Sequence, residues 1–465
     1  MLERMSGTLC EAVLDQSGAA VTLGDLARSN LLLVPLDRQG EWYRYHHLFR
    51  DMLLAQLHRQ EPELIAVLRR HAAGWCQQNG LPEEALEYSM AAGEVDTVAG
   101  LVESAGVPAY WQGRVVTVRR WFQWLEDRCG IEGHPMAAVL ASILYALMGR
   151  PVPAERWADV VYRWQYGGAP RSDDAFTGAW AAVLRAMLCR SGIEQMRADA
   201  DEAARGFAAV GFVAAGPAII GGMACILSGD LNGGDASFQD AVSTGQETGA
   251  HEDRALAFAE RSLVAMARGE WGQAEILADQ AREALRRAGL EERYTTPIVS
   301  AVQARAALHR GDAQAARQQL VNAQRQRPLL TYALPHLAVQ ARIELIRVHL
   351  ALADLAGART LMREIDDLLR RRPGLGTLVG EAHALRSRLA KERGGGAAGA
   401  SALTSAELRL LPLLTTHLPF SEIGEELFVS RNTVKSTVTS IYRKLGAATR
   451  SQAVARAREV GLLEG

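Results

Sequence analysis

Apolar residues recur at the spacing of an α-helix along most of the chain. Between residues 62 and 389 the sequence is almost continuously rich in Leu and Ala, in segments that alternate apolar and polar faces. An apolar residue at every third or fourth position predicts helices that bury one face. The strand-like runs lie near the amino end. The sequence therefore predicts an all-α protein with one small segment there that contains strands.

This segment covers residues 1–57. Helices are predicted at Leu2–Leu14 and Thr22–Ser29, followed by strands at Leu31–Leu36 and Trp42–Tyr45 with a turn-forming Asp-Arg-Gln-Gly run between them. Two helices followed by a hairpin are typical of a winged-helix-like segment.

Two adjacent histidines, His46 and His47, follow the second predicted strand. Adjacent side chains do not converge on one ion as histidines at i and i+4 of a helix do. We therefore expect a packing role for them and no metal site.

The helical region, residues 58–392, is repetitive. A Gly-x-x-x-x-Ala motif recurs, and three copies start 42 residues apart, at 269, 311 and 353. A helix that ends in Gly, followed by a helix whose Ala packs closely, predicts a tetratricopeptide-like solenoid with longer helices than usual. Its groove would bind a small molecule or a protein, although a purely structural spacer is the other interpretation. The pairs are Gly80/Ala85, Gly149/Ala154, Gly269/Ala274 and Gly311/Ala316, with Ala353/Ala358 and Gly93/Val98 as variants.

Residues 206–229 are uncharged and long enough to cross a bilayer. However, the stretch contains Pro217 and six glycines, and no basic cluster flanks it. We expect part of a buried helical hairpin rather than a membrane span. After the repeats, the Gly- and Ala-rich residues 393–402 predict a flexible linker.

The final segment, residues 403–465, predicts a four-helix unit. Thr404 and Glu407 form a capping box for the first helix, and Ser421–Leu427 forms the second. A tight turn leads to a third helix with Ser430 as its N-cap. Thr449 and Gln452 form a second capping box, which opens the helix Arg450–Val460.

The third helix separates apolar and polar residues. Val434, Val438, Ile441 and Leu445 form one stripe, and small or cationic side chains lie on the outer face. Residues 429–458 contain seven Lys or Arg and no Asp or Glu, and a one-sign segment indicates a polyanion partner. We expect this helix to enter the major groove of double-stranded DNA. The candidate DNA-binding residues are Arg431, Asn432, Thr433, Lys435, Ser436, Thr439, Arg443 and Lys444.

The motifs of this segment resemble the DNA-binding domain of LuxR-type transcription regulators. The resemblance rests on Leu403-Thr404, Glu407, Glu422-Ile423, Val429-Ser430, Thr433-Val434-Lys435, Val438, Ile441, Lys444-Leu445-Gly446 and Arg450. It implies that residues 432–445 form the recognition helix and that the helix from Arg450 pairs two domains on DNA. The chain departs from the family at Pro419, Ser421 and Thr437, where the family usually has a capping Ser and often has Lys and His. These departures bear on base preference rather than on the fold.

Residues 31–37 and 42–50 resemble the junction after the ATPase module in large LuxR regulators of the MalT type. That resemblance implies an ATP-binding module before the winged helix. A phosphate-binding loop needs a lysine, and residues 1–390 contain none. We therefore expect the carboxy-terminal half of such a regulator, as a short natural protein or a fragment, with no nucleotide cofactor.

The remaining composition refines the functional prediction. The net charge is only −2, and five cysteines without a C-x-x-C spacing favour a reduced, cytoplasmic protein. No catalytic motif is present, so we expect no enzyme. The sequence predicts a DNA-binding transcription regulator with no membrane association. By resemblance it would be an activator that self-associates as a dimer or higher oligomer and engages RNA polymerase. The alternative is a protein-interaction scaffold, which would lack the steep salt dependence of DNA binding.

Overall fold

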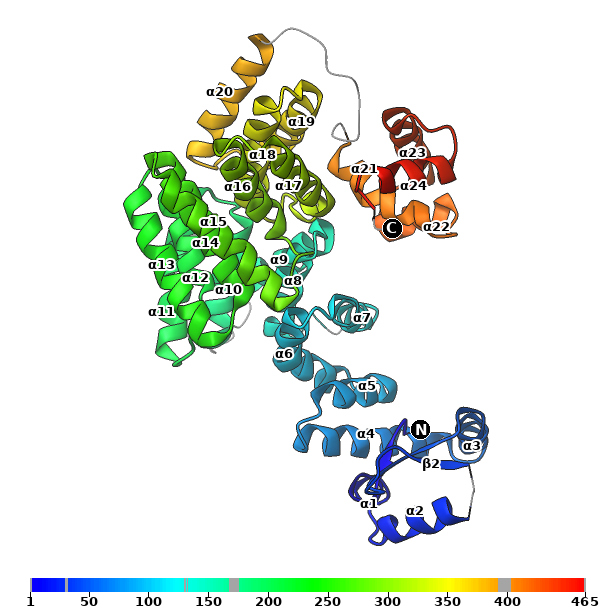
Figure 1. Cartoon of the computed structure of the whole chain (residues 1–465). Helices are drawn as coiled ribbons and strands as arrows, with labels where there is room; N and C mark the ends of the chain where they lie inside the picture. The colour runs from blue at the N-terminus through cyan, green and yellow to red at the C-terminus, as the bar shows by residue number, and fades with distance from the viewer. Residues whose placement is uncertain are drawn as a thin grey trace. The chain divides into compact units, whose positions relative to one another are not determined.

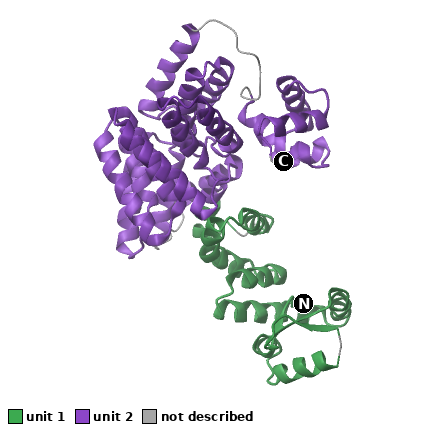
Figure 2. Cartoon of the chain, in the orientation of Figure 1, with its two compact units in different colours: residues 1–141 green, residues 142–465 purple. Residues whose placement is uncertain are grey.

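The computed structural model describes residues 2–29, 32–128, 131, 133–166, 175–391 and 403–463. These residues form 24 α-helices and three short strands, labelled in Figure 1, which confirms the predicted all-α class. The chain divides into two compact units, Met1–Ala141 and Ser142–Gly465 (Figure 2). The predicted linker, residues 393–402, lies outside the described residues.

The first unit begins with a winged-helix arrangement. Strands β1 (Met5–Ser6), β2 (Leu33–Pro35) and β3 (Trp42–Tyr45) form an antiparallel sheet in the order β1-β3-β2. Helices α1 (Gly7–Leu14) and α2 (Ala19–Arg28) complete it. A common core joins these elements, with Leu9, Val13, Leu23, Leu33 and Tyr43 among its buried residues.

The start of the first helix differs from the prediction. Residues 5 and 6 form a strand, because Met5 pairs with Tyr43 of β3. The helix then begins at Gly7, where the Ser6 hydroxyl accepts a hydrogen bond from the Leu9 N–H at 3.2 Å. The pairing partner lies far along the chain, so local helical periodicity could not reveal it.

Helices follow one another through the rest of the first unit. Left-handed glycines, such as Gly80 at φ 70° and Gly93 at φ 80°, end α4 and α5 without the steric cost that a Cβ would bring. The helices are α3 (His47–Gln60), α4 (Pro62–Gln78), α5 (Pro82–Ala92), α6 (Val95–Trp111) and α7 (Val115–Glu126), and α8 (Pro135–Leu147) crosses the boundary between the units.

The second unit contains a series of helical hairpins, which gives the tetratricopeptide-like pattern that the repeats predict. The turns have positive φ at Gly229, Gly269 and Gly311, and at Ala353, the variant position. The alanines five residues after the last three turns, Ala274, Ala316 and Ala358, are fully buried. The helices are α9 (Pro151–Tyr166), α10 (Ala175–Leu188), α11 (Ile193–Ala209), α12 (Gly216–Leu227), α13 (Leu231–Thr248), α14 (His251–Arg268), α15 (Trp271–Ala288), α16 (Thr296–His309), α17 (Ala313–Gln326), α18 (Pro335–Ala351), α19 (Leu355–Arg371) and α20 (Thr377–Lys391), with the 3-10 helix η1 (Arg327–Leu329) after α17.

Two helices of this solenoid, α16 and α18, are enclosed by the elements around them. Residues 296–304 of α16 and 335–346 of α18 are buried on every side. The segment after α19 lies against earlier hairpins, since the Arg372 guanidinium donates to the Leu188 carbonyl at 3.2 Å. The uncharged stretch contributes α12, and no described helix is long and apolar enough to cross a membrane.

Candidate nucleic-acid interface

The last described residues, 403–463, form a small helical domain around its own core. Its elements are α21 (Ser405–Leu410), the 3-10 helix η3 (Leu411–Thr415), α22 (Phe420–Leu427), α23 (Arg431–Leu445) and α24 (Arg450–Glu459). The capping box at the start of α21 has both of its hydrogen bonds: Thr404 N–H donates to the Glu407 carboxylate at 2.7 Å, and Glu407 N–H donates to the Thr404 hydroxyl at 3.3 Å. Prolines bound the next segment: Pro412 lies in η3 and Pro419 precedes α22.

A tight turn joins α22 to α23 and sets the direction of α23. Phe428 ends α22 in the left-handed region at φ 55°. At Gly424 a Cβ would lie only 2.6 Å from the Val429 carbonyl oxygen, so this position needs glycine. Ser430 then caps α23 by accepting from the Thr433 N–H at 3.1 Å, as the sequence predicts.

Helix α23 buries one face and exposes the other. The predicted apolar stripe is buried, with Val434, Val438, Ile441 and Leu445 all in the domain core. Seven of the eight candidate residues are exposed: Arg431, Asn432, Thr433, Lys435, Ser436, Thr439 and Arg443. Since these seven side chains share the solvent face of one helix, the structure brings them together as one surface.

Two hydroxyl groups on this surface donate to carbonyls of their own helix. The Ser436 hydroxyl donates to the Thr433 carbonyl and the Thr439 hydroxyl donates to the Lys435 carbonyl, both at 2.9 Å. These hydroxyls keep their lone pairs as acceptors. The outward donors are therefore the amide of Asn432 and the cations of Arg431, Lys435 and Arg443, which suit phosphate oxygens and the acceptor atoms of bases.

The eighth candidate, Lys444, lies in a different environment. Its ammonium pairs with the Glu407 carboxylate at 2.7 Å, and the two side chains are only 14% and 6% exposed. Burial raises the pKa of Glu407, but the hydrogen bonds from Lys444 and the Thr404 N–H outweigh it and hold that pKa below its usual value. Lys444 therefore ties α23 to α21 rather than joining the exposed surface.

Arg450 has a role that the sequence analysis did not identify. Its guanidinium donates to four backbone carbonyls, those of Leu413, Leu414, Thr416 and Leu418, at 2.6–3.0 Å. These carbonyls belong to η3 and the loop before α22. Arg450 thus holds the entry to α22 in place, and no spacing in the sequence connects it with that loop.

A buried polar cluster joins this domain to the solenoid of the same unit. Glu364 of α19 accepts from Arg342 of α18 at 2.8 Å and lies 3.5 Å from Arg327 of η1. Ser405 of α21 completes the cluster, because its hydroxyl donates to Glu364 and accepts from Arg342, both at 2.9 Å. Arg327 also donates to the Leu403 carbonyl at 2.6 Å. Periodicity could not reveal a junction between residues so far apart in the chain.

The two arginines of this cluster favour the ionised form of Glu364. Burial raises the pKa of Glu364, but the neighbouring guanidinium groups of Arg327 and Arg342 prevail and lower it to about 2. Arg327 is fully buried and Arg342 nearly so. A second contact lies at the turn between α22 and α23, where the Arg150 guanidinium lies 5.1 Å from the centre of the Phe428 ring.

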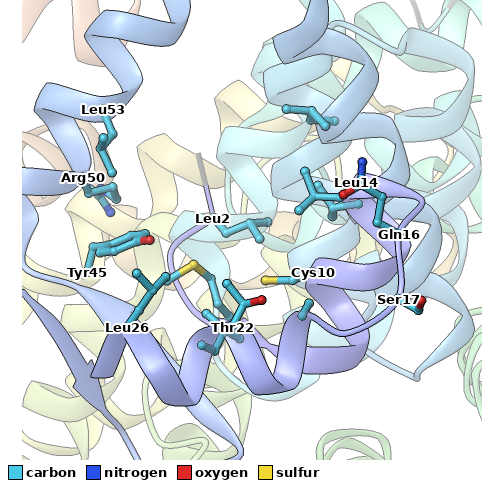
Figure 3. A pocket seen from close by; sticks show the side chains of 15 residues that line it. Leu2, Cys10, Leu14, Gln16, Ser17, Thr22, Leu26, Tyr45, Arg50 and Leu53 are labelled. Atoms are coloured by element: carbon cyan, nitrogen blue, oxygen red, sulfur yellow. The ribbon is translucent and has the colours of Figure 1, made fainter. Parts of the chain in front are cut away.

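The first unit contains an apolar cavity of about 380 Å³, shown in Figure 3. Cys10, Tyr45 and Arg50 are among its polar lining groups, and aliphatic side chains make up most of the wall. Burial, together with the charge of Glu11, raises the pKa of the Cys10 thiol to about 11, which favours the protonated, less reactive form at neutral pH.

The described cysteines and possible metal ligands form no second candidate site. Four cysteines, Cys10, Cys76, Cys189 and Cys225, are free and buried, whereas Cys129 lies outside the described residues. Among the residues with described positions, no group of three or more His, Cys, Asp or Glu side chains could hold a metal ion.

Comparison with known families assigns both ends of the chain. Residues 401–457 match the model of bacterial regulatory proteins of the luxR family. The last domain is a LuxR-family regulatory domain. Residues 1–65 match the MalT winged helix domain. One family model thus matches each end of the chain, a MalT-type winged helix at the amino end and a LuxR-type regulatory domain at the carboxyl end, which confirms both resemblances.

Individual relatives match only parts of the chain. The serine/threonine-protein kinase PknK of Mycobacterium tuberculosis is 28% identical over 191 residues, which cover 40% of this chain and 17% of that protein. The HTH-type transcriptional regulator MalT of Vibrio campbellii is 25% identical over 148 residues, covering 31% and 16%. MalT of Klebsiella pneumoniae is 33% identical over 95 residues, covering 20% and 10%. The matched regions thus span less than a fifth of these relatives.

One solved structure is similar over much of the chain. It is a signal transduction ATPase with a tetratricopeptide repeat sensor from Pyrococcus horikoshii. The TM-score is 0.49 at 14% sequence identity, and the match covers 83% of this chain and 57% of that one.

Proposed function

We propose that this LuxR-type regulator binds double-stranded DNA by inserting α23 into the major groove. Arg431, Asn432 and Lys435, near the amino end of the helix, would contact base edges and phosphates, while Thr433, Ser436 and Thr439 would offer acceptor oxygens. Arg443, two turns after Lys435, would contact the backbone. One observation supports this most directly: the exposed face of α23 carries only polar or cationic side chains, opposite a fully apolar buried stripe.

Helix α24 exposes Arg456, and the exposed Val460 follows the end of the helix four residues later. We assign to this side of α24 the pairing of two copies on a two-half-site operator. By analogy with LuxR-type regulators the protein would activate transcription through RNA polymerase in the cytoplasm. The chain would act without catalysis or a cofactor of its own, and the solenoid would receive the signal from a small molecule or protein.

We also propose a functional division of the chain. Residues 1–57 would form the winged-helix segment, 58–392 the repeat domain and 403–465 the DNA-binding domain. Residues 393–402 would link the last two.

The test is DNA binding by a double variant, Lys435→Ala with Arg443→Ala. Full-length protein would first select fragments from genomic DNA, and titrations by fluorescence anisotropy would then measure affinity at several salt concentrations. Each lost phosphate contact should reduce the slope of log K against log salt by about 0.9. We expect affinity to fall at least tenfold while the thermal transition stays in place, because exposed substitutions usually cost under about 0.5 kcal/mol.

The matched control is Arg286→Ala with Arg287→Ala. Both arginines are exposed on α15 and pair with Glu283, so the control removes the same charge at a distance from α23. Equal DNA binding by the α23 double variant and the wild type would refute the assignment of α23.

A further inference from the structure

A cationic cleft lies between the solenoid and the carboxyl end of α23. It has a volume of about 760 Å³ and is walled by α19, α20 and α23. The described residues of its lining include five cations and no carboxylate. They are Arg359 and Arg363 of α19, Arg386 of α20, and Arg443 and Lys444 of α23.

Arg386 and Lys444 are paired with carboxylates outside the cleft lining. Arg386 pairs with Asp366, and Lys444 pairs with Glu407 at 2.7 Å. In contrast, the Arg363 guanidinium bonds the Thr360 hydroxyl at 3.1 Å, a neutral partner, and Arg443 is exposed. The described lining of the cleft therefore carries a net positive charge, which attracts an anion.

The two walls hold a defined position because the domain is joined to the solenoid. The buried cluster of Glu364, Arg342 and Ser405 links α19 and α18 to α21. Lys444 in turn links α23 to α21 through Glu407. A chain of buried ion pairs and hydrogen bonds thus connects α19 to α23. It places the arginines of α19 opposite the end of α23.

The cleft is continuous with the proposed DNA-binding surface. Lys435, Thr439 and Arg443 lie at i, i+4 and i+8, in one row along α23 that is about 12 Å long. Its last member lines the cleft. On the opposite wall Arg359 and Arg363, at i and i+4, form a second row. Duplex DNA carries one phosphate charge per about 1.7 Å of axis, so a duplex engaged by α23 offers further phosphates beyond the end of the helix.

We propose that the cleft holds the sugar-phosphate backbone of the same duplex that α23 contacts, so that α19 and α20 form part of the DNA interface. This inference rests on the proposed function. A small free anion would satisfy the same charges, but the unbroken row of polar and cationic residues from Lys435 to the cleft favours the duplex. Contacts of this kind position the protein and carry no sequence information.

The experiment uses the full chain with Arg359→Ala and Arg363→Ala combined. Binding to an operator fragment and to unrelated DNA of equal length would be measured over a salt series. We expect affinity for both fragments to fall by a similar factor, and the slope of log K against log salt to decrease by about 1.8 for two lost contacts. The charge-conserving variant Arg359→Lys with Arg363→Lys should restore most of the slope.

The matched control is Arg287→Ala with Arg370→Ala, which removes two exposed cations of the same unit outside the cleft. It should leave the slope unchanged, and circular dichroism melting would verify that every variant is folded. A slope equal to that of the wild type in the cleft variant would overturn the inference and leave the proposed function standing. Absence of DNA binding by the wild type would instead overturn both.

Inorganic phosphate serves as the small-anion probe, at constant ionic strength. If phosphate raised the melting temperature of the wild type and not of the cleft variant, while the DNA salt slopes stayed equal, the cleft would be a small-anion site. That result would also overturn the inference.

Discussion

Two buried glutamates in the second unit have opposite electrostatic environments. Glu364, between Arg327 and Arg342, has its pKa lowered to about 2. Burial raises the pKa of Glu260 to about 8, and the nearby negative charge of Glu344 acts in the same direction, whereas the hydrogen bond from Gln340 opposes the rise only in part. Glu364 is therefore an anion that joins two parts of the unit, whereas Glu260 is a neutral acid inside the solenoid. Counter-charges rather than burial alone decide which role a glutamate takes.

The substitution with the largest expected effect is Glu364→Gln. The amide keeps the shape but leaves Arg327 and Arg342 buried without a counter-charge, and breaking a buried ion pair typically costs about 3–5 kcal/mol. We expect the DNA-binding domain to detach from the solenoid, with faster hydrogen exchange at residues 403–410 and a lower melting temperature.

The control for this test is Asp367→Asn on the same helix, because Asp367 pairs with Arg370 at the surface. It should change stability by less than about 0.5 kcal/mol. Unchanged exchange at residues 403–410 in Glu364→Gln would mean that the buried cluster does not hold the domain.

The next test removes a partly buried cation and leaves its hydrogen-bond acceptors in place. Arg450→Ala leaves four carbonyls of the segment before α22 without their donor, and a hydrogen bond to a charged group contributes about 1.5–3 kcal/mol. Since water can replace part of this set, we expect a loss of about 3 kcal/mol in the stability of the DNA-binding domain. Denaturant unfolding would measure it. Arg443→Ala, at an exposed site on α23, is the comparison, and equal stability of the two variants would contradict the structural role of Arg450.

Local features of the fold follow from the sequence. The apolar stripe of α23, the caps at Thr404 and Ser430, and the strand at Trp42–Tyr45 each depend on neighbours within a few residues. The periods of helix and strand expose such features directly. The same logic located the hairpin turns, including the one at Ala353, where a non-glycine residue adopts φ 58°.

Long-range features did not follow from the sequence. Arg327, Arg431 and Arg450 look alike in a linear sequence, yet one bonds a buried glutamate, one faces solvent and one binds four carbonyls. Likewise His336, Gln340 and Glu344 recur every four residues on α18, a pattern typical of an exposed polar face, but all three are buried. Their burial arises because α18 is enclosed by other parts of the solenoid, which only the tertiary fold determines.

The last test concerns Glu260, whose effect on stability changes gradually with pH. The folded-state pKa of Glu260, about 8, lies above its unfolded value of about 4.5. The folded protein therefore keeps this proton while the unfolded chain releases it, and stability present below pH 4.5 falls as the pH rises toward 8. The slope for this one group is at most about 1.4 kcal/mol per pH unit. Burial also raises the pKa of Asp253, to about 7, which adds a term of the same sign.

Glu260→Gln removes the titrating group and preserves a neutral side chain of the same shape. Denaturant unfolding between pH 5 and 8 should show a shallower decline for this variant than for the wild type, and the variant should be the more stable of the two at pH 8. The Asp253 term is common to both proteins and cancels in the difference. Parallel stability curves across this range would show that Glu260 is ionised in the folded protein. A counter-charge or solvent would then have to reach it, and the contrast with Glu364 would disappear.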